Sequence, residues 1–453
     1  MSAPQNDTWS SHLAFYLSVA GAAVGLGTLW RFPFLVGQYG GGLFVLVFAL
    51  ACILIASPLL VAEFMLGRRG GSNVPAAPGN VAVAAGRSRR WSAIGWFGTL
   101  AMCLIMTYYP VIGGWVFAYV EAFAIGDAST LTRPELESRF AALLADPWRL
   151  AFWQAMFLGA TALICAGGLQ RGIELGNKIM MPGLFAILVG LGIYALDQGN
   201  AAEAIRFLTT VDFSKLNAEL VLAAVGQAFF ATGVGMAIMM QYGSHVDATE
   251  SLPRSAAVVV GSIIVASILS ALLIFPLVFG GGVDPAQGPQ LAFIVLPAIF
   301  IDMPGGAFVG TLFFVLLAFA ALSSSIAGFE VGAEWLMGQF GISRRRALWI
   351  TALVSYLLGF ATVLSFNRWS GVHPLGAFER FRSATLFDLT DFLAANVLLP
   401  VGALLTCLLV GWRLRTDSIA ADFGVYPGVR TTLLWLLRVA CPLAILGVLL
   451  SAL

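Results

Sequence analysis

Charged side chains are scarce in this sequence. Lys and Arg number 24 and Asp and Glu 23 among 453 residues, which makes 10% of the chain, against about 25% in ordinary globular domains. The formal net charge is only +1, so the chain offers no basic surface to nucleic acid. These scarcities argue against a soluble enzyme and against a nucleic-acid-binding protein.

Groups that build catalytic or metal centres are equally few. The three histidines are His12, His245 and His373, and the HExxH and GxSxG motifs are absent. An intramembrane enzyme therefore has little to be built from. The five cysteines fall inside apolar stretches without CxxC spacing, which is typical of small buried side chains. The first residues carry no basic region, so we expect no signal peptide there.

Apolar residues, by contrast, make up 59% of the chain, and 50 glycines add to them. Apolar runs of about 20 residues are long enough to cross a bilayer. They predict eleven spans, near residues 13–36, 43–66, 94–123, 150–169, 179–196, 220–242, 256–280, 307–329, 348–366, 392–412 and 432–453. A shorter stretch at 291–301 is predicted to form an external hairpin or re-entrant cap. We therefore expect an all-α integral membrane protein in contact with the lipid bilayer.

Arginines predict which loops face the cytoplasm, because short cytoplasmic loops retain an excess of Lys and Arg. Basic residues cluster after spans two, four, eight and ten, all on the side of the amino terminus. We expect a multi-pass protein of the inner (plasma) membrane, with its amino terminus cytoplasmic and its carboxy terminus external.

Two predicted spans are interrupted by glycines near their middle. Residues 21–27 of span one read GAAVGLG, and residues 231–235 of span six read ATGVG. Gly21 and Gly25 alone are typical of close helix packing. Two breaks five spans apart indicate instead a five-plus-five inverted repeat with a binding site at the breaks. We expect one transporter domain, 1–453, with repeats at 12–196 and 220–412 and an extra span at 432–453.

Several segments, in order along the chain, closely resemble the neurotransmitter:sodium symporter family, whose bacterial archetype is LeuT. They are VAGAAVGLGTLWRFPF at 19–34, GGG at 40–42, PLLVAEFMLGR at 58–68, YY at 108–109, GW at 114–115, GQAFF at 226–230, YGS at 242–244, IFP at 274–276, LPA at 296–298, SSS at 323–325 and FDLTD at 387–391. The resemblance covers essentially the whole chain. It implies the LeuT fold, with discontinuous spans one and six.

The resemblance also implies sites. The family's second sodium site corresponds to carbonyl and hydroxyl oxygens of Gly21, Val24, Ala320, Ser323 and Ser324, and uncharged oxygens suit a hard monovalent cation. The implied substrate residues are Ala23, Leu26, Gly27, Ile105, Tyr109, Phe230, Ala231, Gly233, Met236 and Gly328.

The outer gate implied by the family pairs Arg31 of span one with Asp391 of span ten. Such a pair can open and close because a buried ion pair is only marginally favourable against hydration. The alternative is an arginine that reaches the external surface alone.

Two features, the first sodium site and the inner gate, depart from the family pattern, and a third position leaves the use of chloride open. The first sodium site would have Thr28, Ala231 and Ile263, or Ser262, where side-chain oxygens are usual, so we expect it to be weakened or absent. The chloride position falls at or beside Ser267, which leaves chloride use open. The usual inner gate is replaced by Asn6 and Gly338, and His245 and His12 are candidates to contribute.

The resemblance predicts a sodium-coupled symporter that imports an amino acid or another small zwitterion by alternating access, using one main sodium site. The alternatives are a proton-coupled variant, a transport-impaired sensor or channel, and an intramembrane enzyme. We expect a small-molecule substrate as the partner, and a monomer or loose dimer.

Overall fold

The structure is a computed structural model that describes residues 8–126, 131–282 and 291–452. Every regular element in these ranges is helical, which confirms the predicted all-α class. The prediction about Asn6 lies outside the described residues.

Most predicted spans are present as long apolar helices. Nine helices of the described chain could cross a membrane by length and composition, or ten if the bent pair His12–Ala23 and Gly27–Tyr39 forms one span. Predicted span six is present as two shorter helices, α11 (Ala218–Thr232) and α12 (Ile238–Gly243). The count of eleven therefore remains a prediction. The nine helices are Gly42–Gly70, Arg89–Ala124, Pro147–Ala166, Leu169–Gln198, Leu252–Gly280, Gly306–Phe340, Arg344–Ser365, Leu386–Arg413 and Pro427–Ser451.

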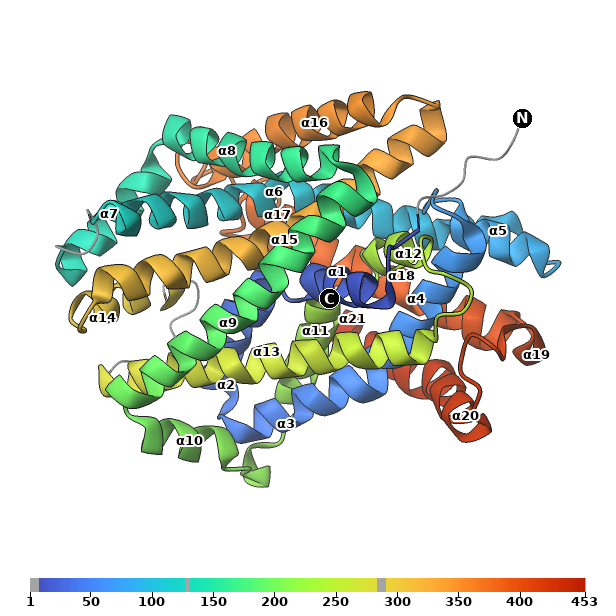
Figure 1. Cartoon of the computed structure of the whole chain (residues 1–453), viewed down its shortest axis with the longest axis horizontal. Helices are drawn as coiled ribbons and strands as arrows, with labels where there is room; N and C mark the ends of the chain where they lie inside the picture. The colour runs from blue at the N-terminus through green and yellow to red at the C-terminus, as the bar shows by residue number, and fades with distance from the viewer. Residues whose placement is uncertain (1–7, 127–130, 283–290, 453) are drawn as a thin grey trace.

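The labels of Figure 1 divide several spans at π-helical turns. Span one consists of α1 (His12–Ala23), the π-helical turn Gly27–Arg31 and α2 (Phe32–Tyr39). The other elements used below are α3 (Gly42–Ala51), α4 (Ser57–Gly70), α6 (Ala93–Ala124), α8 (Pro147–Ala166), α9 (Leu175–Gln198), α10 (Ala201–Thr209), α13 (Leu252–Gly280), α14 (Leu296–Ile301), α15 (Gly306–Phe340), α16 (Arg344–Ser365), α17 (Leu386–Phe392), α18 (Leu399–Thr406) and α21 (Cys441–Ala452).

The two interrupted spans lie at the centre of the molecule. Helix α1 packs against α9, α13 and α15, and α12 packs against α4. In Figure 1, α8 and α16 lie along one edge of the molecule, and α3 and α10 lie along the opposite edge. The breaks are thus enclosed by other helices rather than turned toward lipid.

The peripheral helices present large apolar side chains outward. Leu163 is 77% exposed, Ile179 62%, Leu357 58% and Leu450 71%. An apolar surface of this extent matches a hydrocarbon environment. Four cysteines are buried, Cys103 is half-buried and all five are free, as the sequence predicts.

The stretch 291–301 forms a compact cap. It comprises the π-helical turn Leu291–Val295 and α14. Phe293 is fully buried and its ring lies 5.7 Å from that of Trp30 and 5.8 Å from that of Trp115. The cap therefore covers the end of span one that follows its break.

Candidate binding site

The break in span one leaves backbone groups at the centre of the fold outside the helical hydrogen-bond pattern. Helix α1 ends at Ala23, and Val24 leaves the helical region with φ −82° and ψ 79°. The chain becomes helical again at Gly27, and the two segments meet at 57°. The last carbonyls of the first segment and the first amides of the second have no intrahelical partner. Span one thus offers both acceptors and donors at one point.

The break in span six is held by left-handed backbone. Gly233 and Gly235 have φ of +67° and +82°, and Ala237, at +65°, is the one non-glycine residue with positive φ in the described ranges. A side chain in this region costs about 1–2 kcal/mol. The amide of Gly235 donates to Oε1 of the buried Glu63 at 2.7 Å, which helps fix this conformation. Strain of this kind concentrates at functional sites.

A cavity lies between the two breaks. It is bounded by both interrupted spans together with α6 and α15. Its lining residues are Ala22, Ala23, Gly25, Leu26, Gly27, Thr28, Met102, Ile105, Tyr109, Phe230, Ala231, Gly233, Met236, Ile238 and Ser324.

Nine of the ten predicted substrate residues line this cavity, and Gly328 does not. A Cβ atom at Gly328 would lie 2.3 Å from Cε of Met102 and 3.1 Å from the sulfur of Met106. Met102 therefore occupies the space between Gly328 and the cavity. The sequence prediction missed Met102, because the direction of a flexible methionine depends on its neighbours rather than on a motif.

Tyr109 presents an unpaired polar group to the cavity. Its hydroxyl is buried and makes no hydrogen bond within the described structure. A Cβ atom at Gly25 would lie 3.4 Å from this hydroxyl, which places it beside the break in span one. Buried hydroxyls normally find a partner, so a ligand group is well suited to this position.

One of the predicted sodium ligands, Ser324, connects α15 to span one. Ser324 Oγ donates to the carbonyl of Ala22 at 3.1 Å, and Ser323 Oγ donates to Ala320 at 3.1 Å. Ser323 and Ala320 are fully buried. Within the described chain, no cluster of three or more His, Cys, Asp or Glu side chains could hold a metal ion. The predicted set of carbonyls and hydroxyls is of a different kind, and it suits an alkali cation rather than a transition metal.

The predicted outer gate is unpaired. Arg31 is exposed and its guanidinium carbon lies 4.9 Å above the ring of Phe230. Its charge lies close enough to Asp391 to interact, but no ion pair joins the two side chains in the described residues. The structure brings the predicted partners into one region without closing the gate.

Comparison with known proteins decides the family. The profile of the "Sodium:neurotransmitter symporter family" matches residues 6–126 and 146–453. The chain belongs to this family. It is 37% identical over 447 residues to the sodium-dependent transporter YhdH of Bacillus subtilis (strain 168), covering 98% of this chain and 97% of that protein. It is 34% identical over 421 residues to a sodium-dependent transporter of Haemophilus influenzae, with 91% of each chain covered.

A solved structure supports the same assignment. The crystal structure of MhsT in complex with L-phenylalanine has a TM-score of 0.89 and 36% sequence identity, with 99% of this chain and 100% of that chain covered. This symporter therefore has the LeuT fold and is an integral membrane transporter rather than an enzyme. Its family and fold support sodium-coupled symport of a small molecule.

Two buried side-chain oxygens are unpaired around the predicted first sodium site. Thr28 Oγ1 and Gln227 Oε1 are buried and without a hydrogen-bond partner, while Gln227 Nε2 donates to the carbonyl of Gly27 at 2.8 Å. Ile263 is fully buried and Ser262 is half-buried. Gln227 was not among the predicted ligands, although its polarity inside an apolar span was a visible signal.

Ser267, the predicted neighbour of a chloride position, is also buried with its hydroxyl unpaired. The hydroxyl of Ser270, one turn along α13, already has a partner, because it donates to the carbonyl of Leu29 at 2.6 Å. An unpaired hydroxyl is compatible with an anion. Chloride use therefore stays a prediction.

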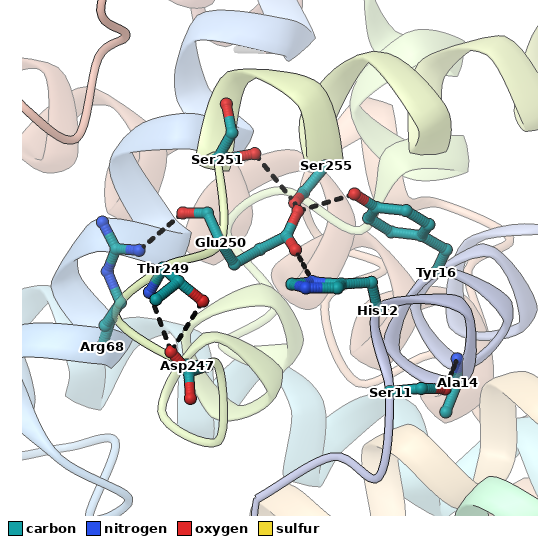
Figure 2. Close-up of polar contacts among 10 residues, drawn as sticks. All are labelled: Ser11, His12, Ala14, Tyr16, Arg68, Asp247, Thr249, Glu250, Ser251 and Ser255. Atoms are coloured by element: carbon teal, nitrogen blue, oxygen red, sulfur yellow. Dashed lines mark hydrogen bonds and ion pairs between the residues drawn. The ribbon is translucent and has the colours of Figure 1, made fainter.

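The residues predicted at the cytoplasmic gate have these surroundings in the structure. Gly338 supplies no gating side chain, and a Cβ atom there would lie 2.9 Å from the amide group of Asn73. His245 is buried beside Gln241, with their nitrogens 3.4 Å apart. His12 contacts the carboxylate of Glu250 (Figure 2), a residue that the sequence prediction missed.

Proposed function

We propose that this symporter imports an amino acid or a related small zwitterion by alternating access, with one main sodium site. The observation that carries the proposal is the cavity between the two breaks, which residues of both breaks line together with Tyr109 and its unpaired hydroxyl. A zwitterion needs hydrogen-bond donors for its anionic group, here called the anion grip, and acceptors close by for its cationic group. The two breaks supply both.

The anion grip is the amino-terminal turn of the resumed span one. The amides of Leu26 and Gly27 have no intrahelical acceptor, and the helix dipole favours negative charge there. Tyr109 adds a hydroxyl donor. A substrate carboxylate is expected at this point, and its amine is expected against the carbonyls of Ala23, Phe230 and Ala231.

The side chain of the substrate faces small and flexible groups. Gly233 and Ala231 add little bulk, while Ile105, Met102 and Met236 can adapt their positions. MhsT, whose crystal structure holds L-phenylalanine, is a protein of the same fold. An apolar amino acid is therefore the first substrate to test here.

Sodium would bind at Gly21, Val24, Ala320, Ser323 and Ser324, and would join span one to α15. One sodium ion entering down about 100 mV gains about 2.3 kcal/mol, and a tenfold gradient adds about 1.4 kcal/mol. Together these sustain accumulation of a zwitterion by several hundredfold, to order of magnitude. Two coupled ions would square that ratio.

The topology in this proposal follows from the arginines. The amino terminus is cytoplasmic and the carboxy terminus is external in the inner membrane, and the inverted repeats comprise 12–196 and 220–412. Each repeat then contributes one broken helix to the site.

Uptake of labelled amino acids into proteoliposomes tests the proposal, with sodium varied on each side. We expect saturable, concentrative uptake that follows sodium with a Hill coefficient near one and is lost in Ser323→Ala. Ser214→Ala is the matched control, because this exposed serine lies in the 3-10 turn Phe213–Lys215 and its hydroxyl donates to the neighbouring Asp212. A coefficient near two would refute the single-site assignment.

A second candidate, proton coupling, is favoured by Glu63. This side chain is fully buried in α4, and its Oε2 has no partner while Oε1 accepts from Gly235. Proton binding at Oε2 would change the charge beside the break in span six. Uptake driven by a pH gradient without sodium, and lost in Glu63→Gln, would replace sodium coupling with proton coupling.

A further inference from the structure

The carboxylate of Glu250 joins three segments on the inner side of the symporter (Figure 2). Its Oε1 accepts from the Tyr16 hydroxyl at 2.7 Å and from Ser255 Oγ at 2.8 Å, and its Oε2 contacts Nδ1 of His12. His12 and Tyr16 lie one turn apart on α1, and Ser255 lies at the start of α13. One side chain therefore connects the half of span one that precedes the break to span seven.

The position of Glu250 is fixed by its surroundings. Its side chain is only 4% exposed, whereas that of His12 is 63% exposed. Arg68 of α4 donates to the carbonyl of Glu250 at 2.9 Å and pairs with Asp422 at 2.5 Å. The loop that carries Glu250 is thus tied to α4, and the Glu250 carboxylate contacts span one through His12 and Tyr16.

The connection lies at a cavity, and the His12 side chain is exposed there. A cavity of about 280 Å³ borders it, so the contacts can exchange for hydration and are reversible. The cavity is lined by Trp9, Ser10, Ser11, His12, Phe15, Val246, Asp247, Thr249 and Glu250.

We propose that Glu250 is the latch that keeps the cytoplasmic side of this symporter closed, and that His12 and Tyr16 must leave its carboxylate before the inner half of span one can move. The inference rests on the proposed alternating access. Glu250 supplies the side-chain contact to span one that Gly338 cannot make, because a glycine has no side chain.

Asp247 provides a matched comparison in the same loop. Its carboxylate accepts from the amide and hydroxyl of Thr249 at 2.8 and 2.9 Å, and the pKa of Asp247 is lowered first by the amide hydrogen bond. These bonds stay within the loop (Figure 2). Asp247 therefore carries a like charge close enough to interact with His12 and Arg68, but its side-chain hydrogen bonds join no helix to span one.

Hydrogen–deuterium exchange of the purified full chain in sodium-free buffer tests the latch. In Glu250→Gln we expect the amides of residues 12–23 to exchange about tenfold faster, as for the loss of one charge-assisted hydrogen bond. Asp247→Asn should leave them unchanged, and peptides from α6 should match the parent protein in both variants. Equal exchange of 12–23 in Glu250→Gln and Asp247→Asn would overturn the proposal.

Tyr16→Phe provides a second route if Glu250→Gln fails to fold. It removes one donor to the carboxylate and should accelerate exchange of 12–23 by severalfold, and unchanged exchange would contradict the latch. The measurement needs neither substrate nor an ion gradient. If the protein transports normally but the variants show no change in exchange, the latch proposal alone is refuted. If sodium-driven uptake is absent, the proposed function is refuted, and the exchange experiment can still be interpreted.

Discussion

Gly25 is the position where a single methyl group should damage sodium binding most directly. A Cβ atom there would lie 2.5 Å from Ser324 Oγ and 3.4 Å from the Tyr109 hydroxyl. The first distance is far below ordinary contact. In Gly25→Ala the serine must therefore rotate away, which breaks its 3.1 Å hydrogen bond to the carbonyl of Ala22 and displaces a predicted sodium ligand.

The magnitude follows from packing and hydrogen bonding. Forcing one methyl group into a filled site costs about 1–3 kcal/mol, and the lost hydrogen bond adds about 1 kcal/mol. Part of this cost falls on the empty protein as well as on the sodium-bound state. We therefore expect the sodium dissociation constant of Gly25→Ala to rise by about 10- to 100-fold.

Sodium-dependent binding of a labelled substrate to the purified protein measures this constant. Gly226→Ala is the matched control, because Gly226 lies on α11 in the other interrupted span and nothing lies within 4 Å of its Cβ position. If Gly25→Ala bound sodium as tightly as Gly226→Ala, the proposed site between span one and α15 would be wrong.

Two other substitutions probe the substrate site and the helix framework. Tyr109→Phe should weaken substrate binding by about 10- to 100-fold, because a hydroxyl bond to a carboxylate is lost; unchanged affinity in equilibrium binding would remove Tyr109 from the anion grip. Arg344→Gln should lower the thermal midpoint by leaving Glu330, its partner at 2.5 Å, as an uncompensated buried charge worth about 3 kcal/mol. The double variant with Glu330→Gln should recover most of that loss, and no recovery would refute the ion-pair explanation.

Much of the central site could be predicted from the sequence, because its backbone groups follow local motifs. Glycine-interrupted spans mark the breaks, Phe230 directly precedes the second break, and Tyr109 belongs to the YY motif of span three. Gly328 could not be placed correctly, since Met102 of another helix fills the space beside it. Its position depends on packing between α6 and α15 rather than on either sequence alone.

Contacts distant in sequence were harder to predict. Glu250 lies 238 residues from His12 and 234 from Tyr16, and no local pattern links such positions. The outer gate illustrates a different limit. Arg31 and Asp391 were predicted as partners, but whether an ion pair is closed depends on the conformation of the protein, which the sequence alone does not specify.

The glycines between α4 and α12 determine which parts can move separately. A Cβ atom at Gly67 would lie 1.9 Å from the carbonyl oxygen of Met240, and one at Gly243 would lie 2.7 Å from that of Phe64. The two helices are thus in backbone contact from both sides. They are expected to move as one rigid body, so the second half of span six has a fixed neighbour. The first half of span one depends instead on polar contacts at its end. The two broken spans of the predicted inverted repeat are therefore expected to move differently.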